Sequence, residues 1–193
     1  MDREYAPLPI YELGAGAGFH RPTQSQAERV ALDSPALQVM TDLARASPAT
    51  IRPQAPLAGA NQFMITRGVR LLLVADDHEK VLGVITATDL LGERPTQVAV
   101  ARGLRRDELT VADVMTEAGE VDVLTLADVE AARVGHVLET LRRSGRQHAL
   151  VVDAGGLVRG IFSASQLARQ LGVPLPAGGE VARTFPQIEA AIR

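Results

Sequence analysis

The chain has 193 residues, a formal net charge of −3 at pH 7 and no cysteine. The acidic balance argues against general binding to nucleic-acid backbones, and aromatic residues, at 3% of the sequence, are too few to stack unpaired bases. The absence of cysteine excludes disulfides, thiolate catalysis and cysteine-based zinc sites. Apolar runs of about five residues are too short to span a bilayer, so we expect no membrane contact and a cytoplasmic location.

The composition of the first segment, residues 1–35, predicts an irregular arm. It carries four prolines and a glycine–alanine run over residues 14–18, a composition that neither holds a helix nor fills a strand. A phosphate-binding glycine loop is the functional alternative, but it would require a GKS or GKT sequence after the glycines, and none follows.

The rest of the chain contains an internal repeat. A shift of 77 residues places Gly68 on Gly145 and Gly83 on Gly160, and the VMT of residues 39–41 recurs at residues 114–116. Units this small are marginal alone, so we expect the two copies to pack on each other's sheets with pseudo-two-fold symmetry. We expect a first repeat over 36–92, a linker over 93–108, a second repeat over 109–172, and a tail with a short helix over 173–193.

Each repeat predicts the order strand, helix, strand, strand, helix, so the expected fold is α/β (mixed α+β). Gly68 and Gly145 are each placed to stop a helix in the left-handed conformation. Each second strand leads directly into a helix that starts at a hydroxyl residue, Thr86 in one copy and Ser163 in the other. The expected segments are an extended piece at 50–52, strands at 71–75, 81–85, 149–152 and 157–162, and a solvated connector at 102–108 with at most an extra helical turn at 96–101.

These features resemble the cystathionine β-synthase (CBS) domain family. The resemblance rests on the VMT that opens each copy, on the run GVITATD at residues 83–89, and on the sequence TIRP at residues 50–53. It covers roughly residues 36–172. It implies a compact pair of repeats, commonly a homodimer, with clefts between the repeats that often hold AMP, ADP, ATP or S-adenosylmethionine.

Thr86 and Asp89 admit two interpretations. A Thr-x-x-Asp sequence is a helix-capping box, and Ser163 with Gln166 fits the same pattern. The same geometry offers a hydroxyl and free N–H groups to a phosphate, and a carboxylate to the hydroxyls of a ribose. The residues that the resemblance assigns to nucleotide binding are Thr50 and Ile51 for the adenine, Thr86 for the phosphate, Asp89 for the ribose, Thr88 between them in the sequence, and Ser163 and Gln166 in the second copy.

The second copy departs from the pattern, because Gln166 stands where a ribose-binding aspartate is expected. We therefore expect nucleotide binding mainly at Asp89. Arg142, Arg143 and Arg146, near repeat-equivalents of Arg67 and Arg70, are expected to form a solvated helix end, with contact to a polyphosphate as the alternative. The four histidines do not have the spacing of metal ligands, and we expect them at surface or turn positions. We therefore expect neither a metal site nor a required cofactor.

No catalytic constellation is visible, so we expect no enzyme activity. The leading hypothesis is a sensor in which an adenosine-containing ligand changes the shape of the module and an unidentified regulated protein responds. The alternative is a module that dimerises or serves as a scaffold without any ligand.

Overall fold

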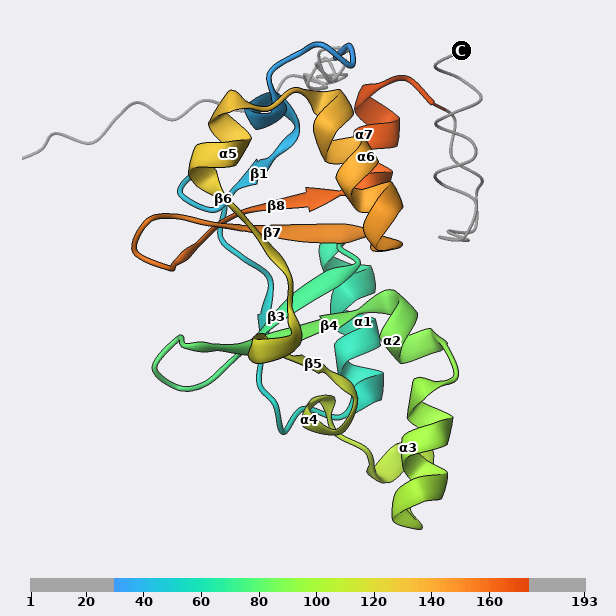
Figure 1. The fold of residues 1–193 in the computed structure, drawn as a ribbon. Coiled ribbons are helices and arrows are strands. Elements are labelled where there is room, and N and C mark those ends of the chain that lie inside the picture. The colour runs from blue at the N-terminus through green and yellow to red at the C-terminus, as the bar shows by residue number, and fades with distance from the viewer. Residues whose placement is uncertain (1–29, 174–193) are drawn as a thin grey trace, which may run out of the picture.

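The computed structural model describes residues 30–173 (Figure 1). The predicted arm, up to residue 29, and the predicted helix of the tail lie outside these residues. The first part of the described chain contains η1 (Ala36–Val39), β1 (Thr41–Asp42), β2 (Thr50–Ile51), α1 (Leu57–Arg67), β3 (Leu71–Ala75), β4 (Val81–Thr86), α2 (Ala87–Leu91) and α3 (Arg94–Arg102). The second part contains η2 (Arg106–Glu108), α4 (Val111–Val114), β5 (Thr116–Glu117), η3 (Ala118–Glu120), β6 (Val123–Thr125), α5 (Leu126–Ala131), α6 (Val134–Ser144), β7 (His148–Val152), β8 (Val158–Ser163) and α7 (Ala164–Gln170).

The predicted helix stops are confirmed. Helices α1 and α6 both have 11 residues, and they end at Gly68 and Gly145, each with φ of 65° in the left-handed region. A side chain with a Cβ is strained in this conformation, so glycine ends both helices at the same place in the repeat. The polypeptide then turns directly into β3 and β7.

The mixed α/β fold is confirmed, and its two sheets exchange their edge strands. One sheet has the order β2-β3-β4-β5 and the other β1-β8-β7-β6. Strand β1, from the start of the first repeat, pairs antiparallel with β8 of the second repeat, and β5, from the start of the second, pairs with β4 of the first. Each sheet therefore contains a strand from the other repeat.

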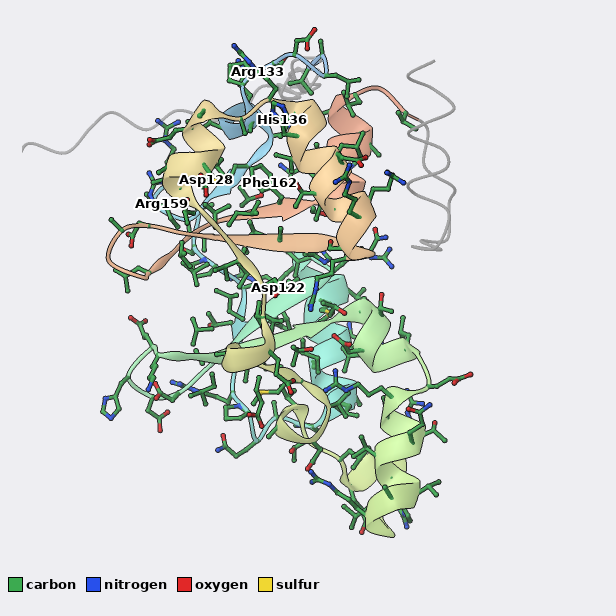
Figure 2. All side chains as sticks on the ribbon, viewed as in Figure 1. Asp122, Asp128, Arg133, His136, Arg159 and Phe162 are labelled. Atoms are coloured by element: carbon green, nitrogen blue, oxygen red, sulfur yellow. The ribbon has the colours of Figure 1, made fainter. Side chains whose placement is uncertain are left out.

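The exchanged strands approach two equivalent glycines. Gly83 lies on β4 opposite Glu117, and Gly160 lies on β8 opposite Asp42. Both glycines occupy the same kind of element, as the duplication predicts. An ion pair adds to one junction, because Arg159 Nη1 on β8 lies 2.9 Å from Asp42 Oδ1; Figure 2 labels Arg159.

Strand alternation divides the core into layers. Leu72 and Val74 of β3 pack toward the helices of the first repeat, whereas Leu71 and Leu73 pack with Leu150 between the two sheets. On β8, the fully buried Phe162 belongs to the cluster under α6 and α7 (Figure 2). The result is two sheets face to face with helices on the outer side of each, as Figure 1 shows.

The linker is more helical than the sequence analysis predicts. Helix α3 covers nine residues, with Pro95 in its first turn and the left-handed Gly103, φ 65°, as its C-cap. Proline near the start and glycine after the end are standard boundary residues of a helix, so the sequence does contain signals for α3. The charged residues nearby favoured a solvated connector instead. This helix has consequences for the site, because its first residue is Arg94.

Candidate functional site

Thr86 and Asp89 form the predicted capping box at the start of α2. The Asp89 backbone N–H donates to Thr86 Oγ1 at 3.3 Å, and Asp89 Oδ2 accepts from Thr86 N at 2.8 Å and from Thr86 Oγ1 at 2.7 Å. The capping interpretation is therefore confirmed for the first copy. Because one carboxylate oxygen receives both bonds from Thr86, the other oxygen, Oδ1, is the one that faces away from the cap.

Arg94 lies next to that second oxygen. Its Nη1 is 3.7 Å from Asp89 Oδ1 and 3.3 Å from Thr116 Oγ1, and its Nη2 donates to the Met115 carbonyl at 2.9 Å. Arg94 thus joins α2 to the opening strand of the second repeat. We call the group of Thr86, Asp89, Arg94 and Thr116 the Asp89 site. The sequence analysis missed Arg94, because nothing in the repeat pattern places residue 94 beside residue 89.

The capping box predicted for Ser163 is wrong. The Ser163 side chain makes no cap hydrogen bond; its Oγ lies 2.9 Å from Ser165 Oγ. Gln166 Oε1 instead accepts a hydrogen bond from Thr41 Oγ1 at 3.0 Å. The physical reason is that β1 brings Thr41 beside Gln166, so the glutamine has a partner 125 residues away and is not available to the cap.

A cavity of about 660 Å³ opens beside Ser163, and we call it the Ser163 cavity. This volume lies within the range of about 300–1,000 Å³ that is typical of small-molecule sites. Both repeats contribute to its wall, since Thr41 and the loop at 47–49 come from the first, and Ser163, Ser165 and Gln166 come from the second. The remaining lining residues are Leu43, Arg67, Gly68, Val69, Arg70, Leu71, His148, Ile161 and Arg169.

His148 is not the surface or turn residue that the sequence analysis expects. It begins β7 opposite Ser163, is half-buried, and lines the Ser163 cavity. Its Nδ1 atom is buried and has no hydrogen-bond partner. Burial, with the positive charge of Arg70, lowers the pKa of the imidazole to about 4, against an opposing effect of Asp89. The side chain is therefore neutral near pH 7 and lies close to residues of both sites.

The predicted adenine-binding residues lie elsewhere. Thr50 and Ile51 line a different cavity, of about 820 Å³, which adjoins the Ser163 cavity at Leu43 and Pro48. Thr88 is exposed in the first turn of α2. The structure therefore brings Thr86 together with Asp89, and Ser163 with Gln166, but it does not place Thr50 and Ile51 in the Ser163 cavity.

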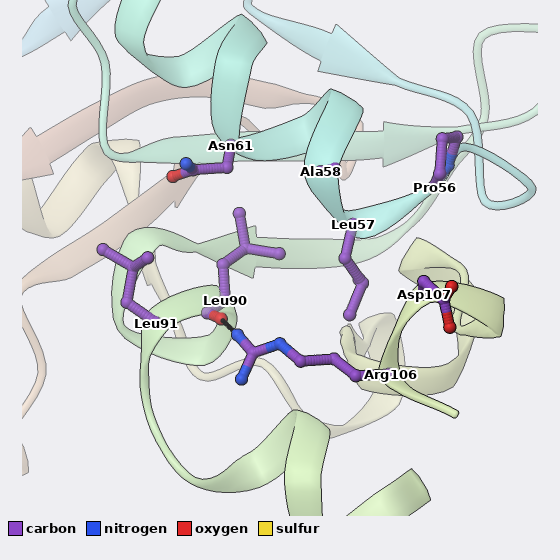
Figure 3. A pocket seen from close by; sticks show the side chains of 8 residues that line it. All are labelled: Pro56, Leu57, Ala58, Asn61, Leu90, Leu91, Arg106 and Asp107. Atoms are coloured by element: carbon purple, nitrogen blue, oxygen red, sulfur yellow. Dashed lines mark hydrogen bonds between the residues drawn. The ribbon is translucent and has the colours of Figure 1, made fainter. Parts of the chain in front are cut away.

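A third cavity, of about 440 Å³, lies between α1, α2 and η2 (Figure 3). Its floor is apolar, with Leu57 from α1 and Leu90 and Leu91 from α2, and Arg106 closes one side by donating from Nη2 to the Leu90 carbonyl at 2.7 Å. None of the predicted nucleotide-binding residues reaches it.

Two further observations limit the chemistry of the described residues. Over residues 30–173 no group of three or more His, Cys, Asp or Glu side chains is placed to hold a metal ion. In the same part of the chain no helix has the length and apolar character needed to cross a membrane.

The chain resembles known proteins in sequence. Residues 38–95 match a protein family described as CBS domain. A curated protein, the L-aspartate semialdehyde sulfurtransferase of Methanocaldococcus jannaschii, is 25% identical over 150 residues, a stretch that covers 78% of this chain and 26% of the sulfurtransferase. The chain thus spans about a quarter of the length of that relative.

Solved structures share the fold. An uncharacterized conserved protein from Pyrococcus horikoshii aligns with a TM-score of 0.57 and 22% identity over 77% of this chain and 100% of that protein. CBSX2, a CBS-pair protein from Arabidopsis thaliana solved in complex with AMP, aligns with a TM-score of 0.52 and 22% identity over 70% of this chain and 94% of CBSX2.

Proposed function

We propose that this chain, which matches the CBS domain family over residues 38–95 and shares the fold of a CBS pair, is a regulatory module that binds an adenosine-containing ligand. CBSX2, whose fold it shares, is a protein solved with AMP. The observation that carries the proposal is the Ser163 cavity, which has the volume of a small-molecule site and walls from both repeats. A ligand there contacts both halves of the module at once, as a sensor requires.

The Asp89 site supports a ribose contact. A carboxylate accepts hydrogen bonds from both hydroxyls of a ribose, and Asp89 keeps one oxygen, Oδ1, outside its capping box. A ribose bound there takes over the oxygen that Arg94 faces at 3.7 Å. Arg94 then lies next to the ligand, where its guanidinium is suited to a phosphate.

The proposal includes a homodimer and no catalysis. Ile65 on α1 and Leu91 on α2 are exposed apolar side chains, 64% and 67% accessible, and Leu91 also lines the apolar cavity of Figure 3. A second copy of the chain covers such side chains by the symmetry of a closed dimer. The proposal also includes a second partner, the unidentified protein that the module regulates.

A ligand panel tests the proposal. We expect AMP, ADP, ATP or S-adenosylmethionine to raise the melting temperature, because a ligand at 100 times its dissociation constant adds roughly 2.7 kcal/mol to stability. Inosine and guanosine counterparts serve as controls for the base. A panel without any shift, confirmed by calorimetry, would contradict the sensor and favour the ligand-free scaffold.

The variant Asp89→Asn tests the ribose contact. We expect about a tenfold loss of nucleotide affinity at the Asp89 site, since a hydrogen bond to a charged group is worth about 1.5–3 kcal/mol against about 0.5–1.5 for a neutral one. Asp128→Asn is the matched control, because Asp128 Oδ2 accepts from Thr125 Oγ1 at 2.6 Å in a similar cap on α5. Equal affinity in wild type and Asp89→Asn would leave Asp89 as a capping residue.

A further inference from the structure

The charged residues that line the Ser163 cavity all have one sign. Its lining includes Arg67, Arg70 and Arg169, and no aspartate or glutamate is among the described residues that line it. Arg67 and Arg169 lie in the last turns of α1 and α7, and Arg70 immediately precedes β3, so three separate elements direct cations to one cavity. Three guanidinium groups exceed what a neutral or singly charged ligand requires.

An unsatisfied polar atom lies in the same wall. His148 Nδ1 is buried without a hydrogen-bond partner, although buried polar atoms in folded proteins are normally paired. His148 pairs with Ser163 in the β7–β8 ladder. Its ring lines the cavity, but the buried Nδ1 presents no surface to a ligand there.

Gln166 makes this cavity different from the Asp89 site. Its Oε1 is held by Thr41 Oγ1 at 3.0 Å, and it carries no charge with which to attract ribose hydroxyls. The cavity therefore offers only a weak hydrogen-bond acceptor for ribose hydroxyls, but several arginines that donate hydrogen bonds to an anion. Arg67 also stacks on Phe63, with its Cζ 5.6 Å from the ring centroid, which restricts where the guanidinium points.

We propose that the Ser163 cavity binds a chain of two or more phosphates, held by Arg67, Arg70 and Arg169. The inference deepens the proposed function, because ADP and ATP carry such a chain, whereas AMP carries one phosphate and S-adenosylmethionine a positive sulfonium. The same chemistry is present in inorganic polyphosphate. Recognition runs through the phosphates and not through the ribose.

Calorimetry with inorganic tripolyphosphate, in EDTA to remove divalent metals, tests the inference on the full chain. We expect tripolyphosphate to bind, to compete with ATP, and to weaken as salt is raised, because partly exposed charges are screened. We expect ATP to bind more tightly than AMP at this cavity. Titration with ATP and tripolyphosphate in parallel separates a nucleotide site from a general polyphosphate site.

Two variants assign the binding to the cavity. Arg169→Gln and Arg67→Gln each remove one exposed guanidinium, and each should weaken tripolyphosphate and ATP about tenfold and bring the ATP and AMP affinities closer. Arg143→Gln is the matched control, since Arg143 is an exposed arginine in the last turn of α6 that pairs with Glu139 away from the cavity. Unchanged melting curves show that the variants are folded.

The outcomes separate this inference from the proposed function. Failure of tripolyphosphate to bind, or equal binding to wild type and both variants, overturns the phosphate-chain site; AMP binding in that case leaves the regulatory module standing. Tripolyphosphate binding without any adenosine-specific binding supports the phosphate-chain site and overturns the adenosine ligand. No binding of either overturns both.

Discussion

Gly83 and Gly160 are equivalent in the repeat, yet alanine at the two positions should have different effects. A Cβ at Gly83 would lie 2.2 Å from the Thr116 backbone oxygen, whereas a Cβ at Gly160 would lie 2.3 Å from the Met40 sulfur. A backbone oxygen moves only with its strand. A methionine side chain has three rotatable bonds and adapts to a changed cavity.

The structure sets the size of the difference. For Gly83→Ala the two-residue strand β5 must retreat from β4, which breaks its pairing at Gly83 and Val84. Two weakened backbone pairs and the overpacking amount to about 2–4 kcal/mol of lost stability. For Gly160→Ala a shifted Met40 costs about 1 kcal/mol, and the gain of about 0.4–1 kcal/mol from a stiffer unfolded chain is common to both variants and cancels in their comparison. We expect a gap of roughly 2 kcal/mol between the variants.

Urea denaturation followed by circular dichroism measures both values. Gly119→Ala is the control, because nothing lies within 4 Å of its added Cβ, and it should change stability by less than about 0.5 kcal/mol. Met40→Ala should relieve Gly160→Ala, since the two residues are in contact and their effects then do not add. Equal losses at Gly83 and Gly160, or a larger loss at Gly160, would refute the assignment of β5 to the first sheet.

Two further predictions concern His148 and the dimer. The pKa of His148 is about 4 in the folded protein and 6.5 in the unfolded chain, so the unfolded chain takes up a proton first as the pH falls. The free energy of unfolding should therefore fall as the pH drops from about 6.5 toward 4, by at most about 1.4 kcal/mol per pH unit. His148→Leu, which copies Leu71 at the equivalent position, should flatten this part of the pH–stability profile; an unchanged slope would contradict it. Leu91→Arg should convert the dimer to a monomer in light scattering at tens of micromolar protein, while Leu157→Arg, at a leucine 71% accessible on the β7–β8 hairpin, should not. A monomeric wild type, or a Leu91→Arg protein that stays dimeric, would exclude the α1–α2 interface.

The sequence predicted those features of the fold that depend on residues close together in the sequence. The glycine stops at residues 68 and 145, the paired strands and the Thr86–Asp89 cap follow from spacings of a few positions, and all are present. The strand exchange could not be predicted in the same way, because β1 and β5 have two residues each and carry no alternation. Their pairing is decided by partners far along the chain.

The same dependence on partners far along the chain explains which site residues the sequence did not predict. Gln166 has the spacing of a capping residue, but tertiary structure brings Thr41 to it, and that long-range hydrogen bond overrides the local pattern. Arg94 reaches Asp89 only because helix α3 begins where it does. A single sequence shows which residues are able to cap, pair or bind; the packing of the two repeats decides which of these they do.

The exchanged strands also connect each site to the contact between the repeats. At the Ser163 cavity, Thr41 lies on β1 and holds Gln166 of the second repeat, while Asp42 beside it pairs with Arg159. A ligand that replaces the bond between Thr41 and Gln166 removes a side-chain bond that holds β1 against the second repeat. At the Asp89 site, a ligand that displaces Arg94 removes the corresponding link to β5. Because binding and conformation are thermodynamically reciprocal, the proposed ligand at either site should change the free energy of the packing between the repeats, and we expect a partner to respond to that packing.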